Sequence, residues 1–226
     1  MSGLYEGREG RHLPANLPKP LLMLISCYTV LQAVNSNSKK RDHSLDKARI
    51  LSAEQLHRVY KRFAHQFIES FEDPSSIAVI GMQTRGVYMA KRILKETENL
   101  FGLKLDFGVL DVTFYRDDFR TKGKMPEVKV TEIPFDLDGR DIILVDDVLY
   151  TGRTIRSAMD ALISYGRPNS IRFCCMVDRG HRELPITADY VGIEIPTHSS
   201  EEVRVLVKEL DDEDAVLVVE GKEDEA

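Results

Sequence analysis

The residues best suited to chemistry lie in the segment VDDVLYTGRT, residues 145–154. An apolar run ends there in two adjacent carboxylates, Asp146 and Asp147, and a turn with a single glycine, Gly152, follows. Gly152 lets the backbone turn tightly and approach a ligand closely, because glycine has no Cβ. Thr151 and Thr154 add hydroxyl donors, and a helix that begins here directs its free N–H groups at the turn. The turn therefore predicts a phosphate site, formed by Val148, Leu149, Tyr150, Thr151, Gly152, Arg153 and Thr154.

The type of anion follows from two motifs that the sequence lacks. Neither the Walker A pattern G-x-x-x-x-G-K-[ST] nor the dinucleotide fingerprint G-x-G-x-x-G is present, so we expect a monophosphate. Asp146 and Asp147 then serve another part of the ligand, because carboxylates accept hydrogen bonds from sugar hydroxyls or bind the waters of Mg²⁺. A phosphorylated ribose satisfies both halves of the motif. The alternative is a strand end with capping carboxylates and a polar turn.

The surrounding pattern predicts the elements that position this motif. Ser52 and Gln55 form a capping-box signature for a helix at residues 52–71. Further helices are expected at 87–100 and 154–165, and strands at 76–81, 105–115, 142–145, 171–177, 190–195, 204–207 and 215–219. Strand, loop and helix recur in order, which predicts an α/β fold with a mainly parallel sheet flanked by helices. Ligands bind such sheets beyond the carboxyl ends of the strands, where both DDVLYTGRT and MQTRG (residues 82–86) fall.

Composition limits the classes of function. The 226 residues are 42% hydrophobic, enough for a buried core, and the net charge of -6 excludes a generic polyanion binder. The adjacent cysteines Cys174 and Cys175 should point to opposite faces of a strand and pack there. With Cys27 they form neither a disulfide framework nor a metal motif, which favours a reducing cytoplasm.

The first 46 residues differ from the rest of the chain. Residues 1–20 are rich in Gly, Pro and charge, as in disordered segments. Residues 21–34 are apolar but too short to span a bilayer. They resemble the apolar core of a signal peptide, but the cleavage site is poorly formed, which favours an extension from an upstream start codon. We therefore expect an extension at 1–46, disordered or of non-native start, and one domain at 47–226.

Four segments together resemble a known family. ILVDDVLYTGRT (residues 143–154) is similar to the phosphoribosyl pyrophosphate (PRPP) signature of type I phosphoribosyltransferases. GMQTRGVYMAKR (81–92), LDVTFYRDD (110–118) and VDRGHRELPITADYVG (177–192) narrow the resemblance to the bifunctional pyrimidine operon attenuation regulators and uracil phosphoribosyltransferases. The resemblance covers residues 47–220 and implies a type I phosphoribosyltransferase fold with a small hood.

The resemblance also implies a reaction: uracil and PRPP give UMP and pyrophosphate, with Mg²⁺ held through PRPP and waters and no direct protein ligand. Asp146 and Asp147 would hold the ribose hydroxyls, and the turn at 148–154 the 5′-phosphate. Further implied residues are Thr84 and Arg85 for pyrophosphate, Tyr115 and Arg116 at the start of a mobile loop, and Arg179, Tyr190 and Val191 for the base. Tyr150 stands where purine phosphoribosyltransferases commonly carry an acidic residue, which favours a pyrimidine.

The family also binds pyrimidine operon leader messenger RNA. A basic stripe on the first helix and two hood residues are the RNA candidates: Arg58, Lys61, Arg62, His65, His181 and Arg182. Against RNA binding, Thr187 and Glu194 stand where RNA-binding members carry positive charge, and each lost phosphate contact weakens binding. An RNA-binding attenuator with little catalysis and a purine-type transferase are the alternatives. We also expect a homo-oligomer and no membrane partner.

Overall fold

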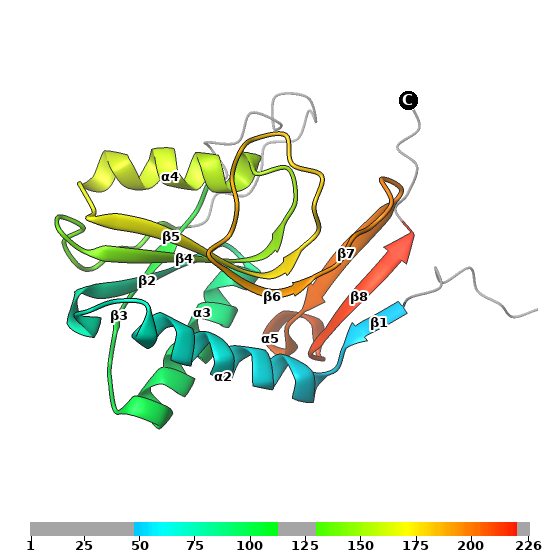
Figure 1. Cartoon of the computed structure of the whole chain (residues 1–226), viewed down its shortest axis with the longest axis horizontal. Coiled ribbons are helices and arrows are strands. Elements are labelled where there is room, and N and C mark those ends of the chain that lie inside the picture. Colours follow the sequence, from blue (N-terminus) through cyan, green and yellow to red (C-terminus); the bar gives the residue numbers. More distant parts are fainter. Residues whose placement is uncertain (1–47, 113–129, 221–226) are drawn as a thin grey trace, which may run out of the picture. The chain divides into compact units, whose positions relative to one another are not determined.

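The computed structural model describes residues 48–112 and 130–220 (Figure 1). A five-stranded sheet has the order β3-β2-β4-β5-β6, and all four of its strand pairs are parallel. Its strands are β2 (Ile77–Met82), β3 (Asp106–Leu110), β4 (Asp141–Leu149), β5 (Ser170–Asp178) and β6 (Tyr190–Glu194). The helices are α2 (Ala53–Glu69), α3 (Arg85–Phe101), α4 (Arg153–Tyr165) and the single turn α5 (Lys208–Asp211), with a 3-10 turn η2 at Pro74–Ser76. The predicted α/β class is confirmed.

Helices cover both faces of this sheet (Figure 1). Alternate strand residues point to opposite faces, so Val79 packs with α2 and α3 whereas Ile80 packs with α4. Cys174 and Cys175 are both buried and divide in the same way, which confirms their predicted packing role.

The second sheet differs from the sequence prediction. It has the order β1-β8-β7 and is antiparallel, with strands β1 (Ala48–Leu51), β7 (Glu201–Leu206) and β8 (Ala215–Glu220). β7 and β8 were expected as further strands of a largely parallel sheet. The chain between them is short, and a parallel crossover needs about a dozen residues or more, so they pair as neighbours instead. β1 was not predicted, because four residues show too little alternation.

Short sequence patterns predicted the ends of most helices closely. The capping box at the start of α2 is present: the Gln55 N–H donates to Ser52 Oγ at 3.4 Å, and the Ser52 N–H donates to Gln55 Oε1 at 2.8 Å. Helix α3 begins two residues earlier than predicted and α4 one residue earlier. β3 ends at Leu110 rather than at 115. None of the helices described is both long and apolar enough to cross a membrane.

Candidate active site

The candidate site lies where β2 and β4 end. Gly86, in the first turn of α3, packs directly on β4, since a Cβ added there would lie 2.3 Å from the Val145 carbonyl oxygen. This contact brings the loop at 82–86 beside the carboxylates that follow Val145. The loop is also tied to β3, because the Gln83 N–H donates to the Leu110 carbonyl at 2.9 Å. The Gln83–Thr84 peptide bond is cis.

Asp146 and Asp147 are the last polar residues of β4, and both are half-buried. The Asp147 N–H donates to Asp146 Oδ1 at 2.9 Å, and the Val148 N–H donates to Asp147 Oδ1 at 2.8 Å. Burial raises the pKa of Asp147, although the Val148 N–H and the charge of Arg85 act in the opposite direction. Part of the Asp147 surface still reaches water. Burial therefore disfavours the charged form of the Asp147 carboxylate, which lies at the end of β4 as a hydrogen-bond acceptor.

The turn after β4 has the conformation that its glycine predicts. Gly152 has φ +91° and lies directly before α4, with the side chains of Leu184 and Ile186 about it. A Cβ here would lie 3.5 Å from Leu184 Cβ, and the positive φ itself disfavours other residues. The turn therefore brings the amino end of α4, whose first N–H groups have no partner within the helix, to this site.

A cavity of about 380 Å³ lies over this turn. Its lining consists of Asp146, Val148, Leu149, Tyr150, Thr151, Gly152, Arg153, Thr154, Ile155, Phe173 and Arg179. The structure thus gathers the whole predicted phosphate turn, one of the two carboxylates and one predicted base residue about one space. Phe173 and Ile155 were missed, because a buried strand or helix residue carries no sequence signal for a site.

Arg179 is held inside the protein. Its Nε donates to Thr197 Oγ1 at 2.8 Å, and its Nη2 donates to the Glu201 carbonyl. Its guanidinium lies 4.1 Å from the centre of the Tyr150 ring, a cation–π contact. The His181 ring meets the same tyrosine edge-on at 5.8 Å. Tyr150 is therefore fixed between two basic residues at the mouth of the cavity.

The hood, residues 179–189 between β5 and β6, is bonded to the phosphate turn. Arg182 Nη1 donates to the Tyr150 carbonyl at 2.8 Å, and the Glu183 N–H donates to the Thr151 carbonyl at 3.0 Å. Beside it lies a second cavity of about 560 Å³. Its lining is Asp178, Arg179, Gly180, His181, Arg182, Thr187, Glu194, Ile195, Pro196 and Thr197.

The other two predicted base residues lie elsewhere. Tyr190 is buried in the core against Phe67, with ring centres 5.0 Å apart, and neither Tyr190 nor Val191 lines either cavity. The segment that does reach the hood cavity is Glu194 to Thr197, at the carboxyl end of β6. The rule that ligands bind at carboxyl strand ends would have pointed there.

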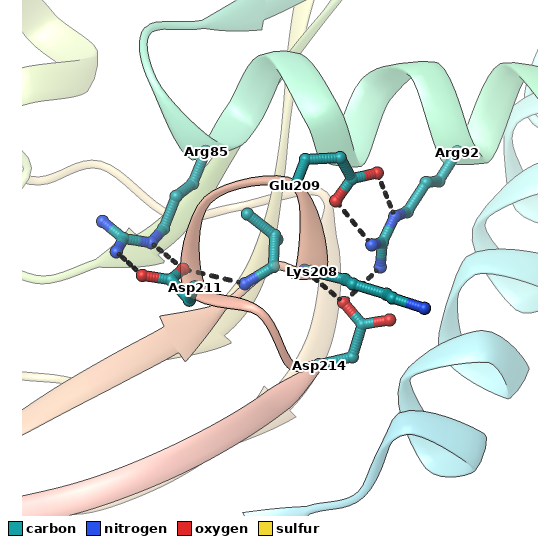
Figure 2. Close-up of polar contacts among 7 residues, drawn as sticks. Arg85, Arg92, Lys208, Glu209, Asp211 and Asp214 are labelled. Atoms are coloured by element: carbon teal, nitrogen blue, oxygen red, sulfur yellow. Dashed lines mark hydrogen bonds and ion pairs between the residues drawn. The ribbon is translucent and has the colours of Figure 1, made fainter.

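Thr84 and Arg85 line neither cavity. Arg85 instead pairs with Asp211 of α5, with Nη2 at 2.8 Å from Oδ1 and Nε at 3.3 Å from Oδ2 (Figure 2). Its charge nevertheless acts on Asp147, where it opposes the rise in pKa that burial causes. The predicted loop residues Tyr115 and Arg116 lie outside the described residues.

The RNA candidates divide into two groups. Arg58 and Lys61 are exposed on α2. Arg62 Nη2 donates to the Val191 and Gly192 carbonyls at 2.9 and 2.6 Å, and so ties α2 to the edge strand β6. The His65 ring lies edge-on to Phe101 at 5.0 Å, and His181 Nε2 lies 2.7 Å from the Thr197 carbonyl oxygen.

A family model described as the phosphoribosyl transferase domain matches residues 47–210. The chain therefore belongs to the phosphoribosyltransferase family. Solved structures with the same fold include a hypoxanthine-guanine phosphoribosyltransferase of Bacillus anthracis (25% identical, TM-score 0.54, covering 66% of this chain and 84% of that one). A hypoxanthine phosphoribosyltransferase of Staphylococcus aureus shares the fold at 20% identity (TM-score 0.59, 80% of this chain and 95% of that one).

Curated relatives narrow the family to the proteins named "Bifunctional protein PyrR". That of Elusimicrobium minutum is 47% identical over 170 residues, which are 75% of this chain and 95% of the relative. That of Thermus thermophilus is 49% identical over 170 residues, 75% and 94% of the two chains. The family indicated by the sequence motifs is thus confirmed, and with it an enzyme of the glycosyltransferase class that transfers phosphoribosyl groups. These relatives do not favour either alternative, an RNA-binding attenuator with little catalysis or a purine-type transferase.

Proposed function

We propose that this phosphoribosyltransferase joins uracil to the ribose of PRPP and releases pyrophosphate. The observation that carries the proposal is the cavity of about 380 Å³ in which Asp146, the phosphate turn and Tyr150 meet. A ligand with a phosphate at one end and a diol at the other matches its donors and acceptors. Tyr150 offers an aromatic wall where a purine-type enzyme would carry an acid.

In the reaction, the bond from the ribose anomeric carbon to pyrophosphate breaks, and the bond to the uracil nitrogen forms with loss of the nitrogen's proton. The sugar passes through a cation-like state, as in glycoside chemistry, so no protein nucleophile is needed. The residues contribute position and charge. The turn at 148–154 binds the 5′-phosphate, and Asp146 and Asp147 accept from the ribose hydroxyls and favour the positive charge.

Arg85 is proposed to bind the leaving pyrophosphate, because a guanidinium can hold phosphate oxygens bidentately. The described residues hold no cluster of three or more His, Cys, Asp or Glu side chains that could ligate a metal. Carboxylates accept hydrogen bonds from the waters of Mg²⁺, so Asp146 and Asp147 are proposed to accept from the waters of a Mg²⁺ ion carried by PRPP. Bound in this way, Mg²⁺ would neutralise charge on the pyrophosphate.

The test is to incubate the protein with PRPP, Mg²⁺ and each nucleobase in turn, and to measure pyrophosphate release. We expect release with uracil. Its absence with uracil would refute the proposal, and release with hypoxanthine or guanine would favour a purine enzyme. Asp160→Asn is a suitable control variant, because Asp160 is exposed on α4, pairs only loosely with Arg156 at 3.7 Å and lies outside the cavity.

RNA binding is proposed as the second function of the same chain, through the exposed Arg58 and Lys61. Arg62 and Arg182 already donate to backbone carbonyls, so the RNA would have to compete for them. A pyrimidine operon leader RNA should be titrated with and without UMP at two salt concentrations. Replacing both Arg58 and Lys61 by Ala should reduce the salt slope by about two. Binding that depends neither on UMP nor on the RNA sequence would show that RNA is bound through non-specific charge attraction alone.

We further propose that the protein is a homo-oligomer that works in the cytoplasm with PRPP, uracil and UMP. Light scattering on the eluting protein measures the assembly, and a monomer at all concentrations would contradict it.

A further inference from the structure

We propose that Asp211 is a positioning residue for Arg85: it holds one edge of the guanidinium and leaves the other edge to bind pyrophosphate. This inference rests on the proposed role of Arg85 in the transfer reaction. It gives α5, a single helical turn, a positioning role in the reaction.

The geometry of the pair is side-on. Both hydrogen bonds to Asp211 come from the Nε and Nη2 edge of Arg85. A guanidinium has five N–H donors in a rigid fork, so the terminal edge, with Nη1 and the second Nη2 hydrogen, remains for a second bidentate partner. Within the described part of the chain, Nη1 makes no hydrogen bond. Pyrophosphate can therefore bind without breaking the pair.

Asp211 is itself held rigidly. Its Oδ2 accepts from the Val207 N–H at 3.0 Å, and its own N–H donates to the Val207 carbonyl at 2.8 Å. Burial acts to raise the pKa of Asp211, but the bonds from Val207 and Arg85 outweigh it and the net pKa is lowered. The carboxylate thus stays ionised in its place between β7 and β8.

Helix α5 is also clamped to α3 at a second point (Figure 2). Arg92, two turns along α3 from Arg85, pairs with Glu209 at 2.6 Å and with Asp214 at 2.8 Å. The two arginines share one face of α3, because residues seven apart are two turns apart. This clamp keeps α5, and with it Asp211, in register with the first turn of α3.

Asp147 is an alternative partner for Arg85, so the position of the Arg85 guanidinium matters. The charge of Arg85 acts on Asp147, where it opposes the rise in pKa that burial causes. Without Asp211, the flexible side chain would be drawn toward Asp147, which is proposed to accept from the ribose hydroxyls. Asp211 therefore keeps the leaving-group residue and the ribose residue apart. Its own negative charge opposes pyrophosphate binding, so an experiment must decide between positioning and repulsion.

The experiment measures pyrophosphate affinity by calorimetry on the full chain and KM for PRPP by turnover. Asp211→Asn keeps an acceptor but loses the charge that holds Arg85. We expect it to weaken pyrophosphate binding about tenfold and to raise KM for PRPP to a similar extent, a size typical of coupled neighbours. KM for uracil should change by less than about twofold. Asp212→Asn is the matched control, because it removes a negative charge next to Asp211 from an exposed residue that does not pair with Arg85. It should leave both the pyrophosphate affinity and KM for PRPP unchanged.

A double-mutant cycle separates positioning from loss of structure. In an Arg85→Ala background, Asp211→Asn should have no further effect on pyrophosphate binding. Unchanged or tighter binding in Asp211→Asn alone, or an equal loss in both backgrounds, would overturn the proposal. Pyrophosphate binding needs no base, so a failure of uracil transfer would refute the proposed substrate and leave this test intact. Unchanged affinity in Arg85→Ala would refute the role of Arg85 and this inference together.

Discussion

The two aspartates at the ends of β4 have opposite electrostatic environments. Asp147 lies at the carboxyl end, where burial outweighs its hydrogen bonds and raises its pKa. Asp141 lies at the amino end, where burial also acts to raise the pKa. There the side chains of Ser170, Ser76 and Asn169 donate to the carboxylate, and the net pKa is lowered. The ionised Asp147 therefore lowers the stability of the folded protein and serves the ligand, whereas the ionised Asp141 stabilises the sheet.

Asp147→Asn should therefore lose turnover by a hundredfold or more, on the order found when a group that stabilises transition-state charge is removed, yet raise stability at neutral pH. A carboxyl with a raised folded pKa contributes stability below its unfolded value, and this is lost as pH rises through the folded value. The gain in stability of Asp147→Asn over the wild type should thus disappear as pH falls below about 4. Thermal unfolding across pH and steady-state turnover measure the two effects.

Asp141→Asn is the control, with the opposite sign. A lowered pKa gives stability that is present above the unfolded value and lost as pH falls through the folded one. This variant should unfold at lower temperature than the wild type at pH 7 and approach it in acid. Equal losses of stability and turnover in Asp147→Asn would mean that Asp147 is a structural cap.

At the scale of elements, the site depends on how closely α3 approaches β4. Gly86 lies against the Val145 carbonyl, and Gly81 lies against Val87, since a Cβ on Gly81 would come within 2.6 Å of the Val87 Cα. Two glycines, Gly81 just before the loop at 82–86 and Gly86 at its end, thus remove the side chains that would separate helix from sheet. The loop and the carboxylates of β4 share one edge because of this contact.

Gly86→Ala should push the first turn of α3 away from β4. Overpacking against backbone costs about 1–3 kcal/mol, and the shift should raise KM for PRPP because Arg85 moves with the helix. Gly102→Ala, at the other end of α3, has φ +67° and no neighbour within 4 Å. It should cost about 1–2 kcal/mol through its backbone alone and leave KM unchanged. Urea unfolding and kinetics measure both variants, and an unchanged KM in Gly86→Ala would contradict the argument.

At the scale of the whole molecule, several arginines act as cross-links between elements. Arg62 joins α2 to β6, Arg182 joins the hood to the phosphate turn, and Arg179 joins the hood to the segment before β7. Each donates to backbone or hydroxyl oxygens inside the protein. These three arginines are engaged inside the protein and the net charge is -6, so RNA binding would depend on a local basic patch.

The extension at 1–46 remains a prediction, and truncation tests it. β1 pairs with β8 from Ala48 onward, through Ala48 and Val218, and the family match begins at 47. A chain of residues 47–226 should therefore keep kcat/KM for PRPP within about twofold and unfold at the same temperature, because it retains the whole family match and the first paired strand. A fall of several degrees in unfolding temperature would assign a structural role to the extension.

The sequence by itself determined what depends on neighbouring residues. Helix α2 was predicted from its capping box, the packing of Cys174 and Cys175 from the two-residue period of a strand, and the phosphate turn from its glycine. The family followed from four motifs of this kind. These features are local, so the chain carries their cause within a few positions.

Tertiary structure alone decided what depends on distant residues. The second sheet, the hood cavity at Glu194 to Thr197 and the internal partners of Arg62 and Arg182 had no local signal. The clearest case is Arg85, whose partner Asp211 lies 126 positions away. An ion pair requires a distance of a few ångströms, and only the folded path of α3, β7 and β8 brings these two charges together.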